Sequence, residues 1–311
     1  MPFLSHGGHR IRYELKGPAS GPAYVLVNGL TQYAELWRGY CDTLVAKNFR
    51  VLTFDLLGQG ESDKPSLFIN QDDQVAAIRT LVDLLGEGPV FLSGISFGGL
   101  IALRYAIAHG GTLAGLVQMN SFAQLSPQLL LLGNAMRTGL ILGGTSYLQD
   151  LLLPMNLSDA WLGPQLNHLE AIKRQGWLIN DVYALQNLMD SFLDFEALTD
   201  RLGAIRIPTM ILNGEFDFLT PRSLHETLRA NIPDSALIII PHAYHAFTLE
   251  KPALTAELLA NFATDVLAGK WKGGGSVWIA PEESSGPRNE FMSLLCGLEL
   301  REGGRTRTET A

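Results

Sequence analysis

Short continuous apolar runs recur along most of the chain. They are 24–28 (YVLVN), 50–55 (RVLTFD), 90–94 (VFLSG), 113–119 (LAGLVQM), 209–213 (TMILN) and 236–240 (ALIII). Continuous runs, rather than alternating ones, are expected for strands of a parallel sheet, because helices cover both of its faces. We therefore predict a buried strand at each run.

Helical patterns separate these predicted strands. They cover 72–85, 100–109, 222–231 and 252–267. This alternation of strand and helix predicts an α/β fold with a doubly wound, mostly parallel sheet. The earlier segment 11–15 alternates between apolar and polar residues instead, so we expect it in an antiparallel hairpin at the edge of the sheet.

The alternation stops in the middle of the chain. Residues 123–198 are rich in Leu and helical patterns and contain no strong strand signal. An insertion at this point would lie over the carboxyl ends of the strands, where open α/β sheets bind ligands. We predict a helical lid, inserted into a core made of 1–122 and 199–269. The alternative is a set of extra helices packed on the side of the core.

The composition changes again after Gly269. Residues 270–275 (KWKGGG) look like a linker, and 282–288 are polar and contain Pro and Gly. We therefore interpret 270–311 as a C-terminal linker and tail and a candidate for disorder, above all at 301–311. Within it, 291–300 is compatible with a short docked helix.

The overall composition favours a globular protein with a large core. Of the 311 residues, 47% are hydrophobic and 17% are charged, which is unlike a disordered chain. The net charge of -8 and the absence of a basic patch argue against a nucleic-acid partner. No feature of the sequence specifies an oligomeric state.

Several features favour a cytoplasmic location. The first residues, MPFLSH, show no secretory signal. The longest apolar tract, 125–144, is interrupted by Gln128, Asn134 and Arg137, so we predict no membrane span. Cys41 and Cys296, far apart in sequence, are expected to be unpaired thiols of a reducing compartment.

The segment Gly94-Ile95-Ser96-Phe97-Gly98 is the strongest chemical signal. It matches G-x-S-x-G between a predicted strand and a predicted helix. In such a turn the serine hydroxyl is exposed at the tip, and the flanking glycines avoid collisions with the neighbouring strand and helix. We predict that Ser96 is a catalytic nucleophile.

A serine nucleophile needs a base and an acid that orients the base. Asp217 follows the predicted strand 209–213, and His245 follows the strand 236–240, so all three residues lie past the carboxyl ends of strands. The order Ser, acid, His is one of the known triad orders. Glu215 is a rival acid and His242 a rival base. We select Asp217 because it precedes the Phe-x-Thr-Pro that opens a helix, and His245 because it directly precedes the last helical segment.

Acyl transfer also requires donors for the developing oxyanion. We predict the backbone N–H of Phe97, next to the nucleophile, and that of Leu30, in the loop after the first predicted strand. Gly29 would let this loop bend toward the substrate. Asp55 follows another strand, but we interpret it as a structural residue of a turn-rich loop.

Bulky side chains that could line an acyl pocket are spread over the core and the predicted lid. They are Trp37, Phe97, Met155, Trp161, Trp177 and Phe192. From these and the first loop we take Asn28, Gly29, Trp37 and Trp161 as candidate substrate-binding residues. There is no cluster with metal-ligand spacing and no phosphate-binding loop, so we predict neither metal nor cofactor.

These motifs resemble the α/β-hydrolase superfamily over residues 10–268. The similarity rests on Asn28-Gly29, Asp55-x-x-Gly58-x-Gly60-x-Ser62, Gly94-x-Ser96-x-Gly98-Gly99, Gly214-x-x-Asp217 and the His245 segment. Most of the family has His-Gly where this chain has Asn28-Gly29, which changes the hydrogen bonding of that loop. The segments 27–29, 69–75 and 212–217 are also similar to 3-hydroxyacyl carrier-protein transacylases and to the synthase that joins two hydroxyacyl chains for rhamnolipid.

The resemblance implies a serine hydrolase that cleaves carboxylic esters with an apolar acyl or alcohol portion. The alternative is an acyltransferase that moves a 3-hydroxyacyl group from a thioester to an alcohol or thiol. A third possibility is a non-catalytic ligand receptor on the same scaffold. In the first two cases the partner is a small ester or thioester. Dehalogenases and epoxide hydrolases of this fold use an aspartate nucleophile where this chain has Ser96, which disfavours both.

Overall fold

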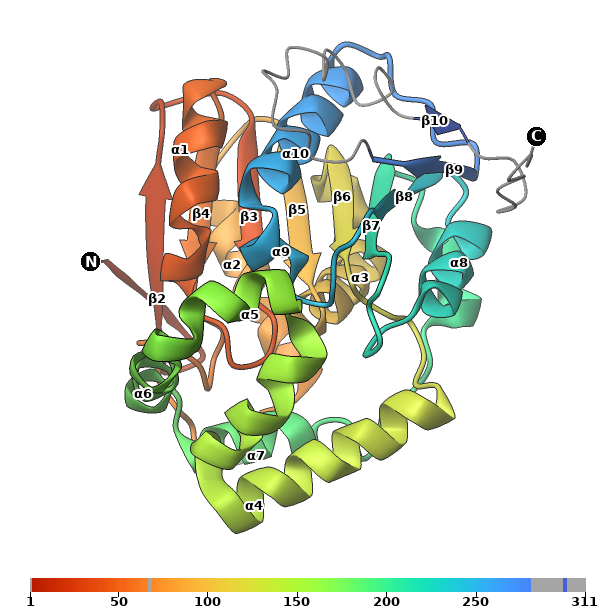
Figure 1. Ribbon diagram of the computed structural model, residues 1–311. Helices are drawn as coiled ribbons and strands as arrows, with labels where there is room; N and C mark the ends of the chain where they lie inside the picture. The colour runs from red at the N-terminus through yellow and green to blue at the C-terminus, as the bar shows by residue number, and fades with distance from the viewer. Residues whose placement is uncertain (1, 67–68, 281–298, 301–311) are drawn as a thin grey trace, which may run out of the picture.

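A twisted sheet forms the centre of the molecule (Figure 1). The structure, a computed structural model, describes residues 2–66, 69–280 and 299–300. In this part of the chain the sheet has ten strands in the order β1-β2-β4-β3-β5-β6-β7-β8-β9-β10. Their bounds are β1 Phe3–His6, β2 His9–Lys16, β3 Ala23–Val27, β4 Arg50–Phe54, β5 Val90–Ile95, β6 Gly115–Met119, β7 Thr209–Gly214, β8 Ser235–Ile240, β9 Ser276–Ile279 and β10 Glu299–Leu300.

The apolar runs form the parallel centre of this sheet. Strands β4, β3, β5, β6, β7 and β8 pair in parallel, and every residue of these strands is buried. The predicted doubly wound, mostly parallel sheet is confirmed. The predicted edge hairpin is confirmed as well, since β1 and β2 pair antiparallel and β2 runs antiparallel to β4.

Helices cover both faces of the sheet and divide the core into two layers. Helices α1 (Arg38–Ala46) and α10 (Pro252–Leu267) lie side by side on the face toward the viewer in Figure 1. Helices α2 (Gln71–Leu84), α3 (Phe97–His109) and α8 (Arg222–Asn231) pack into the other layer. Short helical segments complete the core: η1 Ala34–Trp37, η2 Gly110–Thr112, η4 Thr199–Ala204 and α9 Phe247–Glu250.

The segment between β6 and β7 contains the helices α4 (Pro127–Asn156), α5 (Asp159–Gln165), η3 (Leu166–His168), α6 (Leu169–Ile179) and α7 (Val182–Asp190). In Figure 1 these helices lie beyond one end of the strands, below the sheet. The long helix α4 bends at Gly144, whose φ of 68° and ψ of -168° are not helical. Such a conformation is accessible almost only to glycine, so Gly144 lets α4 fold back.

The segment after α10 differs from the expected linker. Residues 276–279 form β9, which pairs in parallel with β8, and Val277 is buried in the core. The turn before it uses Gly274 and Gly275, both with positive φ. The short strand β10, at 299–300, pairs with β9. The predicted polar segment 282–288, the tail 301–311, Cys296 and most of the predicted helix 291–300 lie outside the described residues.

No helix within 2–66 or 69–280 combines the length and the apolar character needed to cross a membrane.

Candidate active site

Ser96 occupies a strained turn between β5 and α3. Its φ is 52° and its ψ is -118°, a combination that non-glycine residues rarely adopt. The turn is held on both sides, because the Ser96 N–H donates to the Met119 carbonyl (2.9 Å) and the Leu100 N–H donates to the Ser96 carbonyl (3.0 Å). This is the geometry expected of a nucleophile elbow.

The glycines around Ser96 are required by close backbone contacts. A Cβ on Gly94 would lie 2.3 Å from the Gly98 carbonyl oxygen, and a Cβ on Gly98 would lie 2.3 Å from the Asn28 carbonyl oxygen. Both distances are far below a normal van der Waals contact. The pattern G-x-S-x-G therefore has a steric cause in this chain.

Asp217 and His245 form a buried hydrogen-bonded pair. The His245 Nδ1 lies 2.9 Å from Asp217 Oδ2 and 3.1 Å from Oδ1. Asp217 Oδ1 also accepts from the backbone N–H groups of Leu219 and Thr220, both at 2.9 Å, and Oδ2 accepts from the Thr220 hydroxyl at 2.6 Å. The carboxylate is thus fixed from several sides.

The protonation of this pair follows from its surroundings. Burial alone would raise the pKa of Asp217, but the charge of His245 and the hydrogen bonds from His245 and Thr220 hold that pKa below its ordinary value. An ionised carboxylate only accepts hydrogen bonds. His245 Nδ1 therefore donates to the Asp217 carboxylate, so Nε2 is the ring nitrogen that remains to act as a general base.

The rival residues interact with each other instead. Glu215 Oε2 accepts from the His242 backbone N–H (2.9 Å), and the side chains of both residues are exposed. Neither lines the cavity that contains Ser96 and His245.

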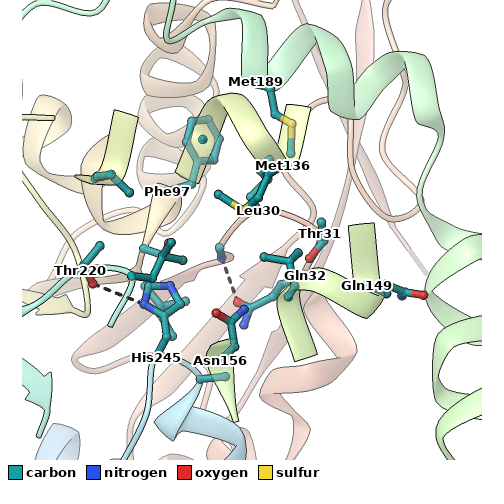
Figure 2. Close-up of a pocket in the computed structure, with 18 of the residues that line it drawn as sticks. Leu30, Thr31, Gln32, Phe97, Met136, Gln149, Asn156, Met189, Thr220 and His245 are labelled. Carbon is teal, nitrogen blue, oxygen red and sulfur yellow. Dashed lines mark hydrogen bonds between the residues drawn. The ribbon is translucent and has the colours of Figure 1, made fainter. Parts of the chain in front are cut away.

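A cavity of about 490 Å³ lies between the elbow and the inserted helices. Ser96, Phe97, Leu30, Gly29 and His245 line its inner end, and Figure 2 shows Leu30, Phe97 and His245 around it. Most of the remaining wall is apolar and comes from the inserted segment and the loops that lead into and out of it. It includes Leu125, Leu129, Leu130, Met136, Leu152, Leu153, Met189, Phe192 and Leu193.

The two predicted oxyanion donors lie at this inner end. Phe97 is the first residue of α3, and the first N–H groups of a helix have no acceptor within it. The loop of Leu30 is braced on both sides of Gly29, whose N–H donates to Gln32 Oε1 (2.9 Å) and whose carbonyl accepts from Gln59 Nε2 (3.3 Å). Within the described residues, the Leu30 N–H donates to no group.

Three of the four candidate substrate-binding residues lie outside the cavity wall, which differs from the prediction; Gly29 alone lines it. Trp37 is buried in the core, where its Nε1–H donates to Asn28 Oδ1 at 2.6 Å, and Asn28 Nδ2 donates to the Phe54 carbonyl at 2.8 Å. Asn28 and Trp37 therefore support the loop from behind. Trp161 lies on α5, away from the cavity lining.

Asp55 has the structural position expected for it. Its carboxylate accepts from the backbone N–H groups of Ala34 (2.7 Å) and Glu61 (2.9 Å). Burial raises its pKa. These bonds fix the loop that follows β4.

Asn120, which the sequence analysis did not single out, positions the histidine loop. It follows β6 with a φ of 41°. Its Nδ2 donates to the carbonyls of His245 (2.7 Å) and Tyr244 (3.1 Å), and its Oδ1 accepts from the Gly214 N–H (2.9 Å). The signal available in the sequence was a polar residue directly after a buried strand.

A second buried histidine lies close to this site. His225 Nε2 accepts from the Ser121 N–H at 3.1 Å, and its Nδ1 faces the Pro221 carbonyl at 3.3 Å. Burial lowers the pKa of His225 to about 4. The neutral ring therefore supports Ser121, whose hydroxyl donates to the Ser96 carbonyl at 3.0 Å.

No group of three or more His, Cys, Asp or Glu side chains within 2–66 and 69–280 is placed to hold a metal ion.

Comparison with known proteins places this geometry in context. The model of the family described as serine aminopeptidase, S33, matches residues 21–252. A protein of Azorhizobium caulinodans, provisionally named carbamate hydrolase RutD, is 24% identical over 270 residues, which cover 86% of this chain and 99% of that protein.

A second relative is polyketide synthase ThaQ of Burkholderia thailandensis. It is 30% identical over 272 residues, which are 85% of this chain and 13% of that much longer protein. Among solved structures, the enol-lactonase of Burkholderia xenovorans has the same fold, with a TM-score of 0.76, 20% identity and coverage of 85% of this chain and 100% of that one.

Proposed function

This chain belongs to the serine aminopeptidase, S33, family of α/β-hydrolases, and from that premise we propose that it cleaves carboxylic esters through an acyl-enzyme on Ser96. One observation carries the proposal. Ser96, in its strained turn, and His245, paired with Asp217, line the inner end of the same cavity together with Leu30 and Phe97.

In the proposed reaction His245 Nε2 removes the proton from the Ser96 hydroxyl as the oxygen attacks the ester carbonyl carbon. Asp217 stabilises the imidazolium that forms. The N–H groups of Leu30 and Phe97 donate to the oxyanion of the tetrahedral intermediate. The C–O bond then breaks, the alcohol leaves with the proton from His245, and a water molecule repeats the sequence to release the acid and restore Ser96.

The cavity supports a substrate with an apolar portion. Leu, Met and Phe make up half of the residues in its wall, and such side chains favour hydrocarbon over charged groups. The lining described contains no Asp or Glu, so a substrate ammonium group would have no counter-charge there.

The proposal is tested with p-nitrophenyl esters of increasing acyl length. We expect the wild type to hydrolyse them and Ser96→Ala to lose roughly 10⁵-fold or more in kcat. Ser93→Ala is the matched control, because Ser93 is a buried serine of β5, the strand that leads into Ser96, and its hydroxyl has no partner in the described residues. It should keep turnover within a few-fold.

Labelling with a fluorophosphonate probe gives a second readout. The probe should modify the wild type and Ser93→Ala but not Ser96→Ala. Turnover that survives in Ser96→Ala, or a wild type that neither turns over esters nor accepts the probe, would refute the proposal.

The same acyl-enzyme can also be captured by an alcohol or thiol, which is the acyltransferase alternative. Turnover is therefore measured with increasing concentrations of both kinds of acceptor. Hydrolysis predicts free acid as the main product throughout, whereas a transferase would shift the product to the new ester or thioester. The cytoplasmic location expected from the sequence stays a prediction.

A further inference from the structure

Two residues that line the cavity each carry a buried side-chain oxygen without a hydrogen-bond partner within the described residues. Asn156 Oδ1 and Gln149 Oε1 are buried, and neither is paired within the described residues. A buried carbonyl oxygen without a donor is uncommon and destabilising in a folded protein. Beside a substrate cavity, such an atom can obtain its missing donor from a bound ligand.

Asn156 is the one of the two that lies beside the catalytic histidine. It is the last residue of α4, and its backbone carbonyl accepts from the N–H of Ala246, the residue after His245, at 2.8 Å. Figure 2 shows the Asn156 side chain next to the His245 ring at the cavity, while Gln149 lies on the opposite side of the view. A substrate group that hydrogen-bonds to Asn156 would therefore lie close to the ester bond on which His245 is proposed to act.

The hydrogen-bonding capacity of the Asn156 amide limits which substrate group can pair with it. A carboxylate or phosphate has only acceptors, so it could take a hydrogen bond from Nδ2 but would leave Oδ1 without a donor. An ammonium would lack the counter-charge noted above. A hydroxyl both donates and accepts, so it pairs with the amide whichever of its two ends faces the cavity.

We propose that Asn156 is a specificity-determining residue that hydrogen-bonds a hydroxyl group close to the scissile ester of an otherwise apolar substrate. This inference rests on the proposed function and names the substrate class of the same site. The hydroxyl belongs either to the acyl part or to the alcohol part, and both supply the same donor.

The experiment compares two pairs of esters. Methyl 3-hydroxyoctanoate against methyl octanoate tests an acyl hydroxyl. The pair 2-hydroxyethyl octanoate and propyl octanoate, which are nearly equal in size, tests an alcohol hydroxyl. We expect the wild type to prefer the hydroxylated member of one pair by about 10-fold in kcat/KM, which corresponds to about 1.4 kcal/mol.

The variants test whether Asn156 causes the preference. Asn156→Leu removes the amide but keeps the backbone carbonyl that accepts from Ala246. In this variant the kcat/KM values of the hydroxylated and unhydroxylated esters should differ by less than 2-fold. Asn156→Asp keeps an acceptor, and the preference should remain. Asn134→Leu is the matched control, because Asn134 lines the same cavity from the same helix without a buried unpaired atom, and it should keep the wild-type ratio.

Binding to Ser96→Ala separates the two proposals. If no ester is turned over, the proposed function fails, and the affinities of the four esters for Ser96→Ala and for the double variant with Asn156→Leu still report on Asn156. If the wild type hydrolyses both members of each pair equally, within 2-fold, the proposed function stands and the role of Asn156 is refuted. A preference that Asn156→Leu retains, in a variant with wild-type thermal stability, refutes it as well.

Discussion

Replacing Asp217 by Asn tests the assignment of the catalytic acid, because the structure determines how the new amide must lie. Oδ1 of Asp217 accepts from two backbone N–H groups, those of Leu219 and Thr220. In Asp217→Asn only the amide oxygen can take this position. The NH₂ group then replaces Oδ2, where it faces His245 Nδ1 and the Thr220 hydroxyl.

This orientation reverses the hydrogen bond to the histidine. The NH₂ group donates, so His245 Nδ1 must accept and its proton moves to Nε2, which is then unable to take the proton of Ser96. We expect kcat to fall by roughly 10⁴-fold, as found when a triad carboxylate becomes an amide, or about 5.5 kcal/mol of transition-state stabilisation. The fold should remain intact, because the Thr220 hydroxyl can accept from the new donor.

The assay is ester hydrolysis at neutral pH, with thermal unfolding measured on the same samples. Glu215→Gln makes the same chemical change at the rival acid, which is exposed and lies outside the cavity, and it should change kcat less than 2-fold. The ¹⁵N chemical shifts of the His245 ring would report the change of tautomer directly. Turnover of Asp217→Asn within 10-fold of the wild type, with Glu215→Gln strongly impaired, would refute the assignment.

Two further predictions concern stability. Burial lowers the folded-state pKa of His225 to about 4 from an ordinary value of 6.5, so the unfolded chain binds a proton at this residue first as the pH falls, and the wild type should lose roughly 2–3 kcal/mol of unfolding free energy between pH 7 and pH 4.5. Urea unfolding at both pH values should show a smaller loss for His225→Gln, whose amide oxygen can still accept from Ser121, and the full loss for the exposed His242→Gln; equal losses in all three proteins would contradict this. At the bend of α4, Gly144→Ala places a side chain at a φ of 68° with no atom within 4 Å of the new Cβ, so backbone strain alone should destabilise the protein by about 1–3 kcal/mol. Gly133→Ala lies in a regular part of the same helix with equally open space and should stabilise the protein by up to about 1 kcal/mol. Denaturant unfolding measures both variants, and a Gly144→Ala protein more stable than Gly133→Ala would overturn the argument.

The turn at Ser96 and the positions of Asp217 and His245 could be predicted from the sequence because their causes are local or follow from a simple rule of sheet topology. A strand buried on both faces needs a continuous apolar run, as in β5, and a tight turn between strand and helix needs glycines, as at Gly94 and Gly98. The positions of Asp217 and His245 followed from the rule that parallel strands bring their carboxyl ends to one edge. No long-range packing had to be known for these inferences.

The features that the sequence did not predict depend on contacts between distant segments. Trp37 has the size of a pocket residue, but its indole N–H is used by Asn28, and nothing in the local sequence reveals that pairing. Strand β9 is only four residues long and follows a glycine-rich turn, so it is recognisable only beside β8. Asn156 reaches the cavity because α4 bends at Gly144 and folds back, which no hydrophobic pattern encodes.

The inserted helices and the catalytic loops form one hydrogen-bonded unit. Glu250 connects them, since its Oε1 accepts from the Ser158 N–H (2.6 Å) and its Oε2 from the Tyr244 N–H (2.8 Å), next to His245. Asn180 Nδ2 also donates to the Thr31 carbonyl (3.0 Å), in the loop of Leu30, the second proposed oxyanion donor. The inserted segment is thus hydrogen-bonded to the loops of His245 and Leu30, so a displacement of its helices would also displace the proposed base and oxyanion donor. We therefore expect substitutions in the inserted helices to change kcat as well as substrate binding.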